Sequence, residues 1–63
     1  MIKLTDSNGS ETYINEAHIL QMYVTEFMNN KLNEVYTGII FINGITIYFK
    51  ETPEEIINLI EGK

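Results

Sequence analysis

The sequence predicts an α+β fold in which a small, curved, mainly antiparallel five-stranded sheet is closed by one C-terminal helix. Two Asn-Gly pairs, at residues 8–9 and 43–44, each separate two runs rich in apolar residues, and this is the strongest short-range signal for a β-hairpin. The stretch from Thr52 to Gly62 carries the start signals, apolar stripe and terminal glycine of a helix. With 63 residues, the chain is expected to form a single domain, 1–63.

Residues 2–5 and 11–14 form the first expected hairpin. Apolar and polar residues alternate in the first run, which is typical of a half-buried strand. A two-residue loop at Asn8-Gly9 would pair Leu4 with Tyr13 and Lys3 with Ile14. That pairing directs Ile14 and Leu4 to opposite faces, so a bulge or a longer loop remains an alternative.

Residues 15–32 are open to two interpretations. Asn15 could cap a helix whose stripe would contain Leu20, Val24 and Met28. However, residues 19–27 are rich in β-branched and aromatic side chains, which favour a pleated surface. We predict a single turn over residues 15–18, a strand over residues 19–27 and a polar connection over residues 28–34.

Residues 35–42 and 45–50 form the central hairpin. A type I′ turn at Asn43-Gly44 would make the numbers of paired residues sum to about 87. Since side chains alternate along a strand, the expected core face is then Gly38, Ile40, Ile42, Ile45, Ile47 and Phe49. The opposite face would carry Ile39, Phe41 and Tyr48. Such an apolar patch is rare on a small monomer, so these three residues are the expected interface of a homo-oligomer.

The C-terminal helix has clear boundaries in the sequence. Thr52 is a favourable N-cap, Pro53 suits the first helical position, and Glu55 completes a capping box. Ile56 and Ile60 are expected to lie buried on the sheet, because a helix this short needs tertiary packing to form.

Composition excludes several classes of function. Nine acidic residues against four lysines and no arginine give a net charge near −5, which argues against binding of duplex nucleic acid. Without cysteine and with His18 as the only histidine, no thiolate zinc site, imidazole cage or nucleophile–base pair can be assembled. We therefore expect no catalysis, metal or cofactor. No stretch is apolar and long enough for membrane insertion, so a cytoplasmic protein is expected.

The seven aromatic residues are dense for a chain of this size. Most of them are expected to serve packing and an oligomer interface. Alternatively, some tyrosines could stack on a planar ligand such as a nucleobase. The candidate ligand-binding residues are then Tyr13, Asn15, Tyr23, Tyr36 and Lys50.

The opening MIKLT, the NGSE turn, the pair Tyr13 and Asn15, the hairpin over residues 37–50 and the ending KETPEEIINLI resemble the FlbD (SwrD) family of small flagellar proteins. The resemblance implies a non-catalytic protein associated with motility, without metal or cofactor. Proteins similar to this family also occur in bacteriophage and in bacteria without flagella. The expected function is that of a small oligomeric binding or adaptor protein. The alternative is a phage anti-defence sponge that sequesters a nucleotide immune signal in pockets between subunits.

Overall fold

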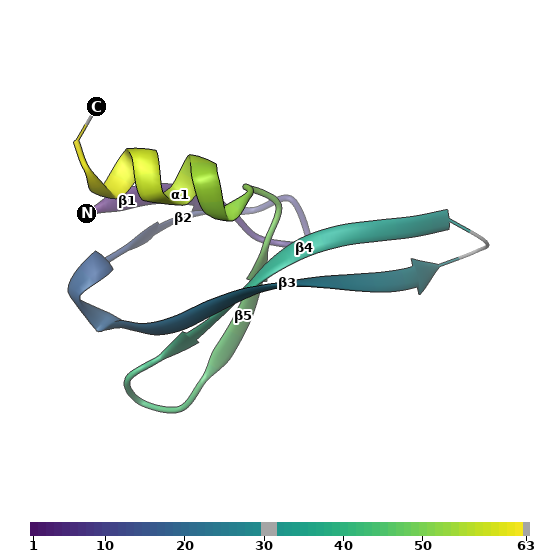
Figure 1. Cartoon of the computed structure of the whole chain (residues 1–63), viewed down its shortest axis with the longest axis horizontal. Helices are drawn as coiled ribbons and strands as arrows, with labels where there is room; N and C mark the ends of the chain where they lie inside the picture. Colours follow the sequence, from purple (N-terminus) through teal and green to yellow (C-terminus); the bar gives the residue numbers. More distant parts are fainter. Residues whose placement is uncertain (30–31, 63) are drawn as a thin grey trace.

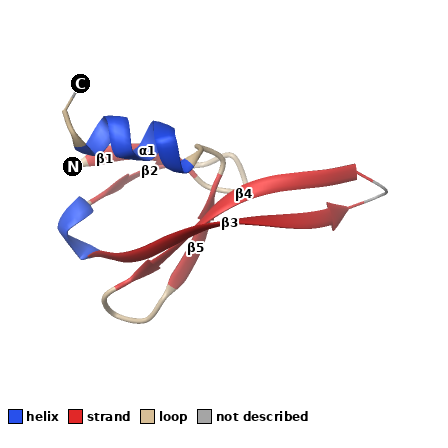
Figure 2. Ribbon diagram, in the orientation of Figure 1, coloured by secondary structure: helices blue, strands red, loops and turns tan. Residues whose placement is uncertain are grey.

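The computed structural model describes residues 1–29 and 32–62. Its strands form two antiparallel sheets, β1–β2 and β3–β4–β5 (Figures 1 and 2). The mixed α+β class with antiparallel strands and a C-terminal helix is confirmed, whereas the prediction of one continuous five-stranded sheet is wrong. The elements are β1 (Ile2–Thr5), β2 (Glu11–Ile14), the 3-10 turn η1 (Glu16–His18), β3 (Ile19–Asn29), β4 (Leu32–Phe41), β5 (Thr46–Phe49) and α1 (Pro53–Ile60).

Main-chain hydrogen bonds join the two sheets where β1 and β5 end. The N–H of Ser7 donates to the carbonyl of Tyr48 at 3.0 Å, and the N–H of Lys50 donates to the carbonyl of Thr5 at 2.8 Å. The Glu51 carboxylate accepts the N–H of Thr5 at 2.9 and 3.0 Å. β1 does not pair with the larger sheet as a further strand. Instead, its apolar side chains pack into the core that the two sheets share.

Both Asn-Gly pairs lie in three-residue loops with the same hydrogen bonds. Asp6 N–H donates to Ser10 and Gly9 N–H donates to Asp6, each at 2.9 Å. Likewise, Phe41 N–H donates to Ile45 at 2.9 Å and Gly44 N–H donates to Phe41 at 2.8 Å. Gly9 and Gly44 have φ values of 91° and 89°. A loop of this kind places its glycine in the left-handed region, whereas a type I′ turn demands positive φ from two residues.

The longer loop shifts the central hairpin by one residue, so the predicted pairing is wrong. Thr37 pairs with Phe49 and Ile39 pairs with Ile47, so that paired numbers sum to 86. A shift of one residue moves every side chain of a strand to the other face. On β4 the face that was expected to be open is therefore the core face, and Ile39 lies fully buried in it. On β5 the predicted core residue Phe49 is fully buried, as expected.

The core lies where the helix, the β1–β2 hairpin and the larger sheet meet. Its buried apolar members come from five elements: Ile2, Leu4, Ile14, Ile39, Phe49 and Ile56. Buried Thr37 is satisfied because its hydroxyl donates to the carbonyl of Glu51 at 2.6 Å. The predicted helix boundaries are confirmed, since Thr52 and Glu55 form the capping box. Ile60 is only partly buried against this core.

Strands β3 and β4 continue well beyond the rest of the molecule. Pairing runs from Ile19 with Phe41 to Asn29 with Leu32, so the expected polar connection over residues 28–34 is largely strand. Residues 30–31 of that connection lie outside the described residues. The strand prediction for residues 19–27 and the turn before it are confirmed. Because β5 pairs only with residues 37–40, the far part of β3–β4 is a two-stranded arm (Figure 1). We define this arm as residues 24–29 and 32–36.

Candidate functional site

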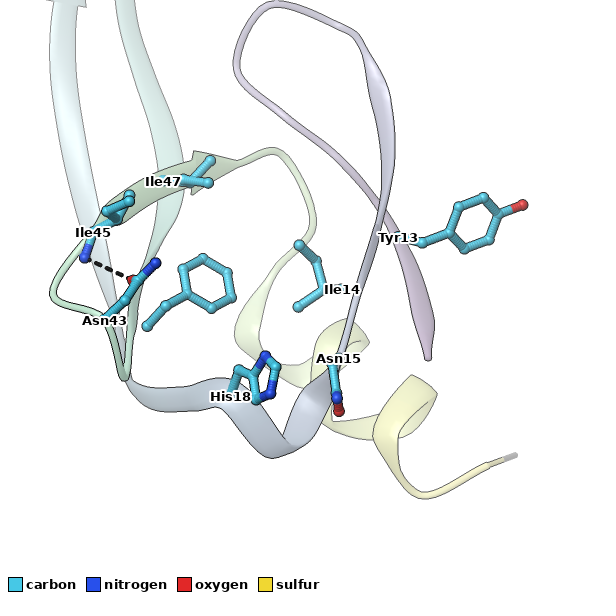
Figure 3. Close-up of a pocket in the computed structure, with 8 residues that line it drawn as sticks. Tyr13, Ile14, Asn15, His18, Asn43, Ile45 and Ile47 are labelled. Carbon is cyan, nitrogen blue, oxygen red and sulfur yellow. Dashed lines mark hydrogen bonds between the residues drawn. The ribbon is translucent and has the colours of Figure 1, made fainter.

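A shallow hollow of about 250 Å³ lies between β2 with η1 on one side and the β4–β5 hairpin on the other (Figure 3). A neighbouring hollow of about 290 Å³ shares His18, Phe41 and Asn43 with it and is also bordered by Ile42. The first hollow is lined by Tyr13, Ile14, Asn15, His18, Phe41, Asn43, Ile45 and Ile47.

Local hydrogen bonds hold both walls of this hollow. The side-chain oxygen of Asn15 caps η1 by accepting the N–H of Ala17 at 3.0 Å. The side-chain oxygen of Asn43 accepts the N–H of Ile45 at 3.1 Å, the bond drawn in Figure 3. One main-chain bond joins the walls, from the N–H of Ile42 to the carbonyl of His18 at 2.9 Å. The hollow is thus built from turn geometry and is not lined by converging reactive groups.

The chemistry of the hollow suits a small, uncharged, partly apolar group. The oxygens of Asn15 and Asn43 are already engaged, which leaves the exposed His18 ring and the amide nitrogens as polar contacts. Tyr13 borders the hollow, but its ring points away from Ile14 and His18 in Figure 3. Lysine does not occur in the lining, so a phosphate would find no ammonium group there.

The one carboxylate close to this region with a shifted pKa is Glu16, at the start of η1. A hydrogen bond from its own backbone N–H, followed by its contact with the N-terminal ammonium of Met1, lowers the pKa of Glu16. The ammonium nitrogen lies 3.0 Å from Glu16 Oε1. This shift favours the ionised form and therefore indicates an anchoring contact for the N-terminus. A general acid or base would need a pKa moved toward neutrality.

The opposite face of the larger sheet carries an aromatic cluster, formed by Tyr23, Phe27, Tyr36 and Tyr48. The ring centroid of Phe27 lies 5.1 Å from that of Tyr48 in an edge-to-face arrangement, and 5.8 Å from that of Tyr36. The Tyr23 hydroxyl donates to that of Tyr48 at 3.4 Å. The ring of Phe27 thus packs against the rings of both Tyr36 and Tyr48.

Two tyrosines of this aromatic cluster have raised pKa values. For Tyr23 the hydrogen bond with Tyr48 is the largest cause, followed by desolvation. For Tyr36 desolvation is the largest cause, followed by its hydrogen bond to Glu34 Oε1 at 3.2 Å. Both hydroxyls therefore stay protonated over the ordinary pH range. The aromatic cluster is thus a packed group of rings with neutral hydroxyls at its edge.

The structure separates the five predicted ligand-binding residues. Tyr13 and Asn15 border the hollow, whereas Tyr23 and Tyr36 belong to the aromatic cluster on the other face. Lys50 is exposed at the end of β5 and does not line the hollow. They do not form one site within a single copy of the chain.

The predicted interface residues are separated as well. Ile39 is fully buried and has no exposed surface to offer another molecule. Phe41 packs against the core and lines the hollow, and Tyr48 lies in the aromatic cluster on the opposite face. The prediction of these interface residues depended on the two-residue loop, and the observed pairing of β4 with β5 differs from it by one residue. The pairing of β3 and β4 out to Asn29 and Leu32 was not predicted, because residues 28–34 contain three asparagines and no β-branched residue and so give no strand signal.

In residues 1–29 and 32–62, no group of three or more acidic or histidine side chains is arranged to hold a metal ion. Within these ranges, no helix is both long enough and apolar enough to cross a membrane. No family model matches the chain, and no curated protein or solved structure shows significant similarity to it. The FlbD resemblance therefore stays a prediction that depends on the residues quoted for it.

Proposed function

We propose that the protein is a non-catalytic binding module that assembles with protein partners, beginning with copies of itself, through the β3–β4 arm. The observation that carries this proposal is the apolar surface on both faces of a two-stranded arm. Val24, Met28 and Val35 share one face and are 58%, 79% and 56% exposed. Phe27 and Tyr36, which contact each other, lie on the other face.

An uncovered arm of this kind is unfavourable in water. A two-stranded hairpin is marginally stable unless a further strand or a packed layer covers it. Burying each of the three aliphatic side chains would contribute about 1.5–3 kcal/mol before the cost of association is subtracted. Assembly therefore supplies stability that a chain of this size, without disulfides, otherwise lacks.

Sedimentation equilibrium at micromolar concentration tests the proposal. The wild-type chain is expected to sediment as a species heavier than the 7.3 kDa monomer. The double variant Val24→Thr and Val35→Thr keeps the shape and strand preference of both residues but lowers their hydrophobicity, so it should shift the equilibrium toward monomer. Ile42→Thr is the matched control, because Ile42 is 61% exposed but lies in the β4–β5 loop. A wild-type monomer would refute the proposal.

A second candidate function is sequestration of a small, planar and uncharged ligand in a hollow of a single chain, in place of the nucleotide expected of a phage anti-defence sponge. It is supported by the two adjoining hollows around His18, Phe41 and Asn43. Mass spectrometry of compounds released from the heat-denatured protein would identify such a ligand. Phe41→Ala should abolish its retention, whereas Lys50→Ala, outside the hollow, should not. Release of no compound from protein purified out of its native host would rule this candidate out.

A further inference from the structure

The hydrogen-bond pattern of the larger sheet shows which main-chain groups of β3 are free. Phe41 N–H donates to the carbonyl of Ile45, the residue before β5, so alternate residues of β4, among them Thr37 and Ile39, direct their main-chain groups toward β5. The residues between them, Gly38 and Ile40, direct theirs toward β3. Their partners on β3, Tyr23 and Gln21, must face β4 in return.

The main-chain groups of the other β3 residues therefore point away from the sheet. These residues are Met22, Val24, Glu26 and Met28, and β3 is an edge strand in the order β3–β4–β5. Within the described part of the chain, no hydrogen bond from another element reaches their N–H or carbonyl groups. β3 has neither proline nor lysine, two of the devices that natural proteins use to block edge pairing. It is an open template for another strand.

The exposed side chains of this edge are symmetric about Val24. Leu20, Val24 and Met28 are 67%, 58% and 79% exposed and follow one another at intervals of four residues. Strand alternation directs Val24 and Met28 toward the same face, and Leu20 is the extra residue of the bulge between Ile19 and Gln21, where the regular edge ends. A second β3 running antiparallel about Val24 would oppose Val24 to Val24 and Leu20 to Met28.

The position of the one carboxylate of β3 also favours pairing about Val24. Glu26 is the only charged residue of β3. Pairing about Glu26 would place two carboxylates directly opposite each other, and pairing about Thr25 would make them diagonal neighbours. Pairing about Val24 opposes Glu26 to Met22 and separates the two carboxylates by four residues, roughly 13 Å along the strand. That distance exceeds the Debye length of about 8 Å at physiological salt.

We infer that β3 of one copy pairs antiparallel with β3 of a second copy about Val24, which joins two three-stranded sheets into one continuous six-stranded sheet. The inference rests on the proposed function, because it specifies the surface through which copies assemble. Each arm then lies beside the body of its partner and exchanges main-chain hydrogen bonds with it. The axis is a two-fold, so the contact closes and does not propagate into a filament.

Site-specific disulfide formation tests this arrangement in a chain that has no cysteine of its own. Val24→Cys would place two sulfur-bearing residues directly opposite, at a hydrogen-bonded pair with Cα atoms about 5.5 Å apart, within the range of a disulfide. Val35→Cys is the matched control, since Val35 has similar exposure and the same face but lies one strand away from the axis. Because Val35 pairs with Glu26, its two copies would be separated by three strand spacings, roughly 14 Å, across the sheet and by four residues, roughly 13 Å, along the strands.

Under mild oxidation, Val24→Cys is expected to become covalent dimer at least ten times faster than Val35→Cys. Equal rates would overturn the pairing about Val24. Sedimentation of both variants under reducing conditions shows whether a negative result rejects only the pairing about Val24 or also the proposed assembly through the arm. Oligomers without preferential cross-linking at residue 24 would reject the edge pairing but keep the proposed function. Monomers without cross-linking would reject both.

Val24→Lys provides a second measurement without a covalent bond. It would place two ammonium groups opposite each other at the axis and should weaken the dimer at least tenfold. Val35→Lys adds the same charge one strand away and should weaken it less. Because each chain is acidic, a lysine at either position lowers the overall repulsion between copies. Association that depended only on net charge would therefore be strengthened by Val24→Lys, and that result would contradict the inference.

Discussion

Gly38→Ala should destabilise the protein because the ring of Tyr23 lies across this glycine. Gly38 and Tyr23 are direct partners on β4 and β3. A Cβ added to Gly38 would lie 2.6 Å from Tyr23 Cζ and 2.9 Å from both Cε1 and the hydroxyl oxygen. Ordinary van der Waals contact needs at least 3.4 Å, so the ring must move by most of an ångström. That movement would break its hydrogen bond with Tyr48.

The expected loss of stability is about 1–3 kcal/mol, the usual cost of overpacking. In a Tyr23→Ala background the obstacle is absent, and the same Gly38→Ala change should stabilise by about 0.4–1 kcal/mol, because alanine restricts the unfolded chain. Urea denaturation of the four proteins followed by circular dichroism gives both values. Gly38→Ala with the same effect in the two backgrounds would refute the proposed contact between ring and glycine.

Three further predictions concern the helix and the aromatic cluster. Ile56→Ala should lower the free energy of unfolding by about 2–5 kcal/mol, because the side chain is fully buried, whereas Ile57→Ala, at a 43% exposed position on the same helix, should cost much less in thermal denaturation. Thr52→Ala removes the capping oxygen that accepts Glu55 N–H at 3.1 Å and should cost about 1 kcal/mol, and Thr52→Ser should restore most of it. The raised pKa values of Tyr23 and Tyr36 mean that their contribution to stability is complete below pH of about 10 and is lost as pH rises through the folded-state pKa values. Alkaline unfolding should therefore move to higher pH in Tyr23→Phe, and no movement relative to the wild type would contradict the assigned hydrogen bond.

The sequence by itself predicted the elements that depend on interactions between residues close together in the chain. The capping box of Thr52 and Glu55 satisfies backbone groups within four residues, so the start of α1 could be predicted. The 3-10 turn after Asn15 and the strand from Ile19 follow in the same way from side-chain chemistry and β-branching. Asn-Gly located both hairpin loops, since a glycine with positive φ is needed in each.

Hairpin register, and with it the identity of the buried face, was decided by tertiary structure. A two-residue and a three-residue loop are both compatible with Asn-Gly, and they differ by one residue in pairing and therefore in which side chains of β4 share a face with Phe49. Core packing of Ile39 and Phe49, together with the bond from the Thr37 hydroxyl to Glu51, selects the longer loop. Packing of β1 over the larger sheet likewise produces two sheets in place of one. Surfaces such as the arm and the hollow depend on which faces of the sheets remain uncovered. They are therefore determined by strand register and packing, which short stretches of sequence do not specify.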